Sequence, residues 1–149
     1  MVKIRQATMD DIEKLAPLLT QLFEQEEEFT PDISVQKKGL RMILENKTIG
    51  SIFVAEQNEQ LLGMVSLLWT VSTALGEKVA WLEDMVIDRD HREKGLGTLL
   101  LTQTLDFAKS VGCHRITLLS DSDNAQARTF YEKLGFKVSN MRPFRLILP

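Results

Sequence analysis

The stretch that decides the fold is Asp84-Met85-Val86-Ile87-Asp88-Arg89-Asp90-His91-Arg92-Glu93-Lys94-Gly95-Leu96-Gly97-Thr98. Its pattern is the end of an apolar strand, a short polar loop with several cations, and two glycines that open a leucine-rich helix. Backbone N–H groups in the first turn of a helix have no partner within the helix, and the helix dipole there favours anions. Glycines at that point let a ligand's phosphates approach the main chain. The stretch therefore predicts a turn that holds a pyrophosphate.

Two other glycine-rich phosphate motifs do not fit this turn. A dinucleotide-binding fingerprint needs a third glycine three positions after Gly97, where this chain has Leu100. A P-loop ends in Gly-Lys-Ser/Thr, whereas Gly97 is followed by Thr98 and Leu99. The remaining alternative is a pair of glycines that only makes a tight strand–helix turn, and the surrounding cations argue against it.

The composition indicates one soluble domain. With 149 residues, 44% of them hydrophobic, the chain can form a single domain, residues 1–149, with a sizeable core. The net charge of −3 argues against a general nucleic-acid binder. Cys113 is the single cysteine, so a reducing compartment is expected. Residues 1–7 are too short and polar for a signal peptide, and no apolar run could cross a bilayer. We therefore expect a cytoplasmic protein with neither a nucleic-acid nor a membrane partner.

Apolar periodicity along the chain predicts an α/β fold. Helices are expected at residues 8–23, 35–45, 96–112 and 125–134, and strands at 2–7, 49–56, 61–71, 78–87, 115–119, 136–138 and 142–148. Pro17 favours a kink or a break in the first helix. The strand–helix–strand order from residue 78 to 119 implies a right-handed parallel crossover. The expected architecture is a mixed, mostly antiparallel twisted sheet of about seven strands with helices on both faces.

An acidic stretch lies between the first two predicted helices. Residues 24–32 hold five carboxylates and no cation. Such a run is commonly a solvated loop. It could instead lie beside the active site and attract a cationic, amine-bearing substrate. Both interpretations stay open at the level of sequence.

Two motifs, correctly ordered and spaced, resemble those of the GNAT superfamily of N-acetyltransferases. The family's Gln/Arg-x-x-Gly-x-Gly/Ala turn is matched by Arg92-Glu93-Lys94-Gly95-Leu96-Gly97. Its second signature, an Asn at a helix start followed by a Tyr and Leu-Gly-Phe, is matched by Asn124 and by Phe130-Tyr131-Glu132-Lys133-Leu134-Gly135-Phe136. The resemblance implies the GNAT fold and an N-acetyltransferase that uses acetyl-CoA.

The resemblance also implies how acetyl-CoA is held. The turn amides would surround the pyrophosphate, and nearby cations, Arg89 among them, would add positive potential. The strand before the turn would bind the pantetheine arm, and the amide of Val86 would stabilise the oxyanion. Asn124 would bind the arm and also cap its own helix. The implied cofactor-binding residues are Met85, Val86, Ile87, Arg92, Glu93, Lys94, Gly95, Leu96, Gly97, Thr98, Asn124 and Tyr131.

The acceptor amine must lose a proton before it attacks, because a free alkylammonium has a pKa of about 10.4. Glu83 and Asp84 are the carboxylates nearest along the chain to the expected thioester. Regular alternation favours Glu83 as the base, directly or through a water, whereas a bulge would favour Asp84. Either could instead be a capped or salt-bridged strand carboxylate. Some relatives carry the base on the next strand, where this chain has Leu119.

Tyr131 matches the family's general acid, which protonates the departing coenzyme A thiolate. A tyrosine on this helix could otherwise be a core residue with its hydroxyl outward, but the Asn and Leu-Gly-Phe context favours catalysis. The expected catalytic residues are Tyr131, Glu83 and Asp84, acting by direct transfer in a ternary complex.

The acceptor is expected to be a primary amine of a small molecule or a protein, and the acidic stretch favours a cationic one. His91 and His114 lack metal-ligand spacing, so no metal is expected. Two alternatives are kept: a non-catalytic acyl-CoA sensor, and a transferase for a different acyl group. A homodimer is also left open.

Overall fold

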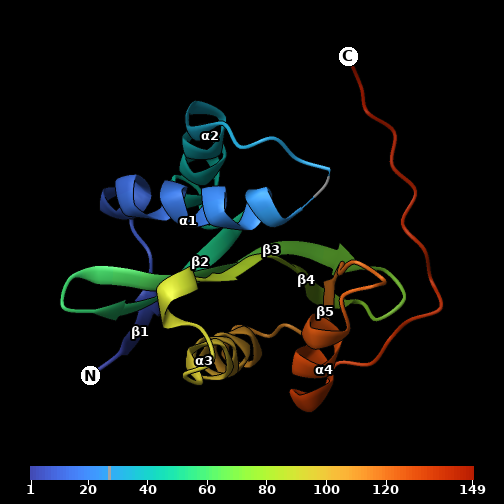
Figure 1. Ribbon diagram of the computed structural model, residues 1–149. Coiled ribbons are helices and arrows are strands. Elements are labelled where there is room, and N and C mark those ends of the chain that lie inside the picture. The colour runs from blue at the N-terminus through green and yellow to red at the C-terminus, as the bar shows by residue number, and fades with distance from the viewer. Residues whose placement is uncertain (27) are drawn as a thin grey trace. The chain divides into compact units, whose positions relative to one another are not determined.

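The computed structural model describes residues 1–26 and 28–149, which form two compact units, residues 1–119 and 120–149 (Figure 1). Glu27, part of the acidic stretch, lies outside the described residues. The first unit contains, in chain order, β1 (Lys3–Gln6), η1 (Met9–Asp11), α1 (Ile12–Gln25), α2 (Ile33–Leu44), β2 (Gly50–Gln57), β3 (Gln60–Ser72), β4 (Glu77–Ile87), η2 (Arg89–His91), α3 (Leu96–Ser110) and β5 (Ile116–Leu118). The second unit contains α4 (Ala125–Lys133).

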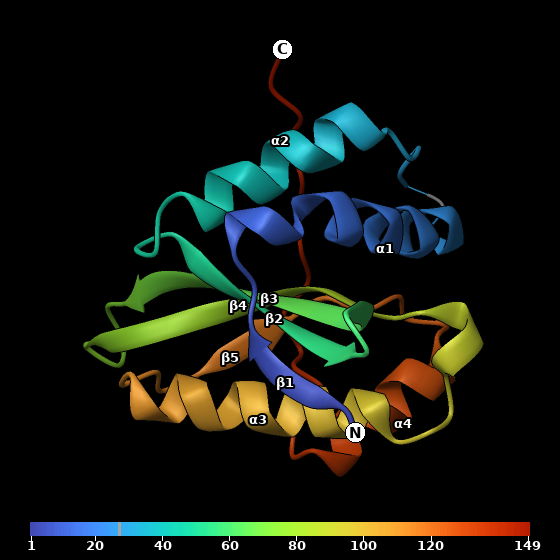
Figure 2. The ribbon, with the colours of Figure 1, turned by 90° about the vertical axis from the view of Figure 1, so that its left-hand side faces the viewer.

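Helices cover both faces of the sheet in the first unit, as the sequence predicts. Figure 2 shows α1 and α2 on one face and α3 along the opposite face. The apolar side chains of α1 recur at helical spacing, and Leu15 and Leu19 are buried against Met64 of β3 and Val86 of β4. The carboxyl end of β4 is therefore anchored in the core, close to the expected site.

The sheet is mixed and mostly antiparallel, in the order β1-β2-β3-β4-β5. Neighbouring strands from β1 to β4 pair antiparallel, and β4 pairs parallel with β5. The connection from β4 through α3 to β5 confirms the predicted strand–helix–strand crossover. The β2–β3 turn is made by Asn58 and Glu59, both at positive φ, as in a two-residue hairpin.

The two strands expected at residues 136–138 and 142–148 are absent from the described structure, which has five strands in place of about seven. Alternating apolar residues predicted them, but a strand forms only where a neighbouring strand accepts and donates its backbone hydrogen bonds. Pro143 also removes one donor from this segment. Apolar alternation was thus insufficient evidence for pairing.

The first helix is more regular than predicted and is shifted along the chain, since α1 begins at Ile12, after the short 3-10 helix η1, and not at residue 8. α1 continues through Pro17 without a break and ends at Gln25, two residues beyond the expected end at Phe23. Burial of Leu15, Ala16 and Leu18 on both sides of the proline compensates for one missing intrahelical hydrogen bond. In the part of the chain that the structure describes, the helices are too short or too polar to cross a membrane.

Candidate functional site

The turn between β4 and α3 has backbone geometry that requires its glycine. Gly95, directly before α3, has φ of 78°, in the left-handed region that a residue with a Cβ rarely adopts. Glu93, two residues earlier, has φ of 63°. These two positive φ values turn the chain sharply from η2 into α3, at the place where the sequence predicts phosphate binding.

The N-terminus of α3 offers backbone amides to a ligand. Leu99 donates the first bond of the helix, to the Gly95 carbonyl at 3.1 Å. The amides of Leu96, Gly97 and Thr98 therefore precede the ladder of the helix, and Gly95 has no side chain to cap them. Amides in this arrangement, together with the helix dipole, favour an anion. The predicted phosphate-binding residues 93–98 thus surround one helix end.

β4 contains a bulge at the two candidate bases. Glu83 pairs with Ser66 and Val86 pairs with Met64, so Asp84 and Met85 lie opposite a single residue of β3. Asp84 itself has φ of 54°. The sequence favours Glu83 as the base only if side chains alternate regularly along the strand. The bulge breaks this alternation, so that assumption is corrected. The condition under which the sequence favours Asp84 is met.

The register also decides which amides of β4 point toward β5. The Asp88 amide donates to the Leu62 carbonyl at 2.7 Å, so these two residues form a hydrogen-bonded pair. Such pairs alternate along an antiparallel ladder, which makes Val86 and Met64 the next one. The main-chain groups of Val86 are therefore directed at β3, contrary to the role expected for its amide. Those of Ile87 are directed away from β3.

The sheet opens between β4 and β5 beside the bulge. The parallel pairing covers Ala80 to Leu82 on β4 and ends at Leu118 on β5. β4 continues to Ile87, so among the described strands its last residues are paired on the β3 side alone. An extended chain could therefore bind along this stretch in place of a strand.

Asp84 lies in an environment that favours its neutral form. Burial raises the pKa of Asp84 from its ordinary 3.8 to about 7, and the negative charges of Glu83 and Glu26 add to this effect. Glu26 follows the last residue of α1. The acidic stretch thus acts electrostatically on a candidate base, although the two are far apart in sequence.

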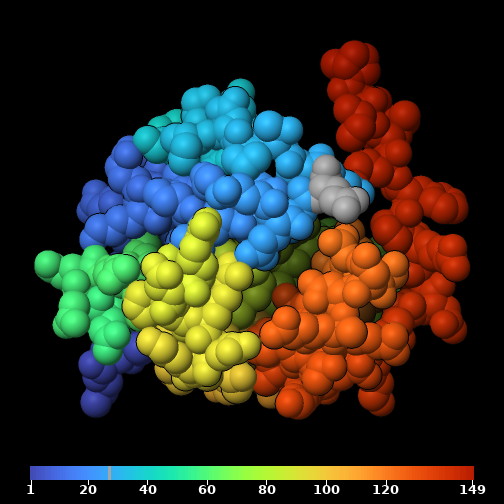
Figure 3. Space-filling view, viewed as in Figure 1, coloured from blue at the N-terminus to red at the C-terminus, as the bar shows by residue number. Residues whose placement is uncertain are grey.

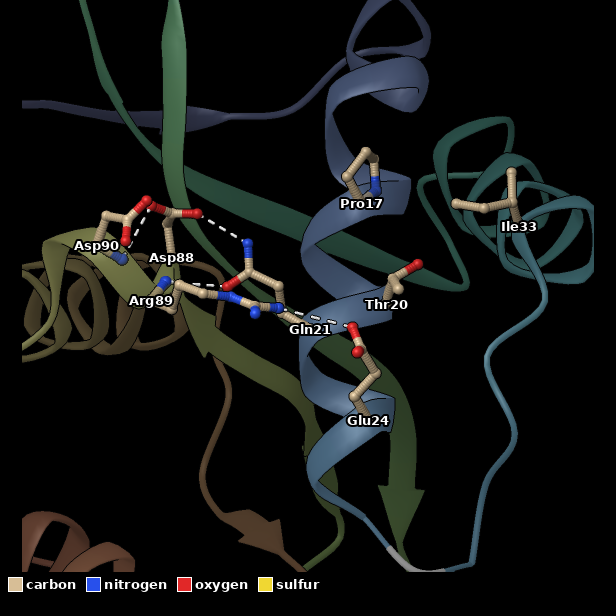
Figure 4. A pocket seen from close by; sticks show the side chains of 8 residues that line it. All are labelled: Pro17, Thr20, Gln21, Glu24, Ile33, Asp88, Arg89 and Asp90. Carbon is tan, nitrogen blue, oxygen red and sulfur yellow. Dashed lines mark hydrogen bonds and ion pairs between the residues drawn. The ribbon is translucent and has the colours of Figure 1, made fainter.

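Side chains of α1 contact the turn that precedes α3. The Gln21 amide nitrogen donates to Asp88 Oδ1 at 2.7 Å, and its oxygen accepts from the Arg89 amide at 2.9 Å (Figure 4). Glu24 forms an ion pair with Arg89 at 3.6 Å. These groups line a hollow of about 400 Å³ together with Pro17, Thr20, Ile33 and Asp90. In the space-filling view the turn, in yellow, lies directly against α1, in blue (Figure 3).

Arg92, the first fixed position of the glycine motif, stabilises the turn through hydrogen bonds within the protein. Its Nε donates to the Ile87 carbonyl at 3.0 Å. With the Gln25 amide oriented to pair donors with acceptors, the Gln25 oxygen accepts from both terminal nitrogens of Arg92, at 2.6 and 3.0 Å. Arg92 therefore joins the end of β4, the turn and the end of α1.

Asn124 and Tyr131 belong to the second unit. Asn124 caps α4, as predicted, because its side-chain oxygen accepts from the Ala127 amide at 3.0 Å. Tyr131 contacts the rings of Phe130 and Phe136, with centroids 5.1 and 5.6 Å away. Burial raises the pKa of Tyr131 to about 12, so its hydroxyl stays protonated at neutral pH.

Three contributors to this region were missed at the level of sequence. Gln21 and Gln25 read as polar residues at the end of an amphipathic helix, and their partners lie more than 60 residues further along the chain. Gly63 of β3 lies beside a shift in the β2–β3 register. Its further role is close approach, since a Cβ there would lie 2.5 Å from Ile87 Cδ1.

Comparisons with known proteins identify the family and the fold. Residues 12–136 match the acetyltransferase (GNAT) family. A Bacillus subtilis protein named as the uncharacterized N-acetyltransferase YhfO is 32% identical over 139 residues, 91% of this chain and 90% of that protein. The crystal structure of a possible acetyltransferase from Clostridium difficile 630 superposes with a TM-score of 0.86 at 21% identity, covering 99% of both chains. A predicted acetyltransferase from Clostridium acetobutylicum, solved with acetyl-CoA, gives a TM-score of 0.82 at 20% identity over 98% of this chain and 96% of that one.

The chain therefore belongs to the acetyltransferase (GNAT) family and is an N-acetyltransferase with the GNAT fold. Members of this family use acetyl-CoA as the acetyl donor. Among the described residues, no group of three or more His, Cys, Asp or Glu side chains is arranged to hold a metal ion.

Proposed function

We propose that this protein transfers the acetyl group of acetyl-CoA directly to a primary amine within a ternary complex. The observation that carries the proposal is the continuous segment from β4 to α3. It presents, in order, a carboxylate whose pKa is about 7, a strand edge open toward β5, and a helix N-terminus preceded by a left-handed glycine. Base, arm site and phosphate site thus follow one another along one stretch of chain.

The amides of residues 93–98 would hold the pyrophosphate, with positive potential from Arg89 and Lys94. Arg92 would act chiefly by fastening the turn, since its guanidinium is already bonded to Ile87 and Gln25. The open side of β4 would bind the pantetheine arm. Acetyl-CoA supplies an activated acetyl thioester there. These residues bind and orient it.

We assign the polarising amide to Met85, next to Val86. The Val86 amide is directed at β3, whereas residues flanking a hydrogen-bonded pair direct their main-chain groups to the other side. An amide on that open side can donate to the carbonyl oxygen that gains negative charge during acyl transfer. Ile87 would contact the arm further along.

Asp84 would be the general base, with a pKa raised chiefly by burial and further by the charge of Glu83. A base with a pKa of about 7 is ionised in about half of the molecules at neutral pH and can still accept a proton effectively. Tyr131 would donate a proton to the leaving thiolate, and its pKa of about 12 keeps that proton available. The lone cysteine supports a reducing, cytoplasmic location.

The acceptor is proposed to be a cationic amine, such as a polyamine, an aminoglycoside, a lysine side chain or a protein N-terminus. The proposal is supported by Glu26, whose charge acts on Asp84, and by the neighbouring carboxylates of the acidic stretch. A negative potential beside the base concentrates cations where the reaction occurs.

The test is release of free thiol when the purified protein, acetyl-CoA and a panel of amines are mixed. Asp84→Asn should lower kcat about 100-fold, while the same exchange at Asp106, on the exposed face of α3, should leave it unchanged. Binding of acetyl-CoA by calorimetry without turnover on any amine would refute the transferase and support an acyl-CoA sensor. If turnover occurs only with other acyl thioesters, the protein is a transferase for a different acyl group, and the proposed mechanism still applies.

A further inference from the structure

Gln21 bridges α1 and the turn before the phosphate site with both ends of its side-chain amide. Its nitrogen donates to Asp88 Oδ1 at 2.7 Å, and its oxygen accepts from the Arg89 backbone amide at 2.9 Å. The orientation of the side-chain amide is fixed, because a backbone N–H can only donate and an ionised carboxylate can only accept. Figure 4 shows this side chain reaching from α1 to both partners.

Asp88 receives this bridge at the point where β4 ends. Its other carboxylate oxygen lies 2.8 Å from His91 Nδ1 and accepts from the Asp90 amide at 3.3 Å. Its own amide is bonded to β3. The hydrogen bond from Gln21 is the largest cause that lowers the pKa of Asp88, followed among the favourable contacts by His91. Asp88 is therefore held ionised and bonded to both the sheet and α1.

The phosphate turn is thus fixed at both ends. Buried Leu96 and Leu100 anchor the α3 end in the core. At the other end, η2 is anchored by Asp88 and by the contact from Gln21 to Arg89. Between these anchors the chain contains two positive φ values, at Glu93 and Gly95. A binding loop held in its bound conformation before the ligand arrives loses less conformational entropy on binding.

We propose that Gln21 is a positioning residue for acetyl-CoA, which aligns the β4–α3 turn so that its amides converge on the pyrophosphate. This inference rests on the proposed function, since it concerns the same phosphate site. The hollow that Gln21 lines lies where α1 contacts the turn. The side-chain amide of Gln21 donates a hydrogen bond to the carboxylate of Asp88 there. Gln21 contacts no reacting atom and acts through the backbone of Arg89.

Gln21→Glu gives a sharp test, because it keeps the acceptor for Arg89 and replaces the donor to Asp88 with a second negative charge. The charged groups around this pair are Glu24 on α1 and Arg89, Asp90 and His91 on the turn. At pH 8 the two carboxylates repel, and acetyl-CoA should bind about tenfold more weakly than to the wild type. At pH 5.5 the pair can share a proton, so the ratio of the two dissociation constants should shrink.

Exchanging the amide and the carboxylate between positions 21 and 88 should restore the hydrogen bond and, with it, the affinity for acetyl-CoA. In Gln21→Glu/Asp88→Asn, the new amide donates to the new carboxylate, and the amide oxygen still accepts from the turn. Affinity at pH 8 should return to within about twofold of the wild type, although each single variant binds more weakly. A residue that merely supported the fold would show this recovery in thermal unfolding, whereas the affinity of the folded single variants for acetyl-CoA would match the wild type. The matched control is Gln60→Glu, the same exchange at an exposed position of β3, which should bind like the wild type.

The measurement is calorimetric affinity for acetyl-CoA at both pH values, with thermal unfolding of each variant as a check on folding. Wild-type affinity in Gln21→Glu at pH 8, or failure of the double variant to recover, would overturn the positioning role. If Gln21→Glu does not fold, Gln21→Ala replaces it, and its loss of affinity should be independent of pH. A wild-type protein that does not bind acetyl-CoA would refute the proposed function itself, which is a different outcome.

Discussion

At the scale of single residues, Asp84 combines a functional assignment with a cost in stability. Its pKa is about 7 in the folded protein and close to 3.8 in the unfolded chain. The folded state therefore holds a proton on this group over a pH range in which the unfolded state has lost it. Stability falls as pH rises through this window, from about 4 to 7, because the ionised carboxylate is poorly accommodated in the fold.

Because of this difference in pKa, Asp84→Asn should stabilise the protein at pH 8 while it lowers kcat. A shift of about three pKa units corresponds to an upper limit of about 4 kcal/mol. At pH 4, where Asp84 is protonated in the fold, the substitution should change stability little. Denaturant unfolding at the two pH values measures both quantities. Equal effects at pH 4 and pH 8 would contradict the raised pKa.

The dependence of the wild-type kcat on pH should also reveal the raised pKa of Asp84. If Asp84 is the base, kcat rises with pH through about 7 and then levels off, because the ionised form is the active one. The profile of Asp84→Asn should lose this step while the residual rate remains measurable. Steady-state rates from pH 5.5 to 9 provide the test.

Tyr131→Phe keeps the ring contacts with Phe130 and Phe136 and removes only the hydroxyl. We expect kcat to fall about 100-fold with little change in the Michaelis constant for acetyl-CoA, since only proton donation is lost. Phe130→Leu is the comparison, because it alters the packing and keeps the hydroxyl. A variant at Tyr131 that is as fast as the wild type at every pH would exclude this residue as the acid.

At the scale of secondary-structure elements, β3 and β4 determine the geometry of the site together. Gly63 lies opposite Ile87, and a Cβ at Gly63 would lie 2.5 Å from Ile87 Cδ1 and 3.0 Å from the Val86 carbonyl. A side chain there would displace the end of the Ile87 side chain and press against the Val86 carbonyl, immediately beyond the bulge. The register that orients the main chain from Asp84 to Ile87 therefore depends on a glycine in the neighbouring strand.

Gly63→Ala should destabilise the fold by about 1 to 3 kcal/mol and lower kcat, because overpacking displaces β4. Gly39→Ala is a matched control, since a Cβ in the middle of α2 meets nothing within 4 Å. The control should be neutral or stabilising by about 0.5 to 1 kcal/mol, through a gain in helix propensity. Chemical unfolding and acetyl-transfer rates of the two variants distinguish them. Equal stability of both would show that β4 adapts to the extra methyl group.

The elements themselves were largely predictable, because periodicity identifies local structure. The strand, the glycine turn and the helix from Asp84 onward were predicted correctly, and so was the cap at Asn124. The bulge at Asp84 was foreseen only as an alternative, since it depends on a register shift against β3. Interactions between distant segments, such as Gln21 with Asp88, leave no periodic signal in either partner.

At the scale of the whole molecule, the uneven distribution of charge should matter more than the net value of −3. The acidic stretch begins in the last turn of α1, and Glu26 acts on Asp84 within the first unit. The sequence leaves open whether these carboxylates form a solvated loop or attract the substrate, and the coupling of Glu26 to the candidate base favours the second interpretation. The family match, residues 12–136, includes parts of both compact units.

The double variant Glu26→Gln/Glu28→Gln should raise the Michaelis constant for a cationic amine several-fold at low ionic strength, because long-range attraction is lost. The difference from the wild type should diminish at high salt, where exposed charges are screened. A neutral amine should show no such salt-dependent difference. A Michaelis constant that is unchanged for every amine would assign these carboxylates to solubility alone.

The parting of β4 from β5 after Leu82 has a consequence for how the protein survives heating. Among the described strands, the end of β4 has a neighbour on the β3 side alone, which makes this stretch a weak point of the sheet. A ligand that binds along the open side would therefore stabilise the native state. By mass action, a ligand at 100 times its dissociation constant adds about 2.7 kcal/mol to the free energy of unfolding. The melting temperature should therefore follow the supply of acetyl-CoA, so the resistance of this enzyme to unfolding would depend on the metabolic state of the cell.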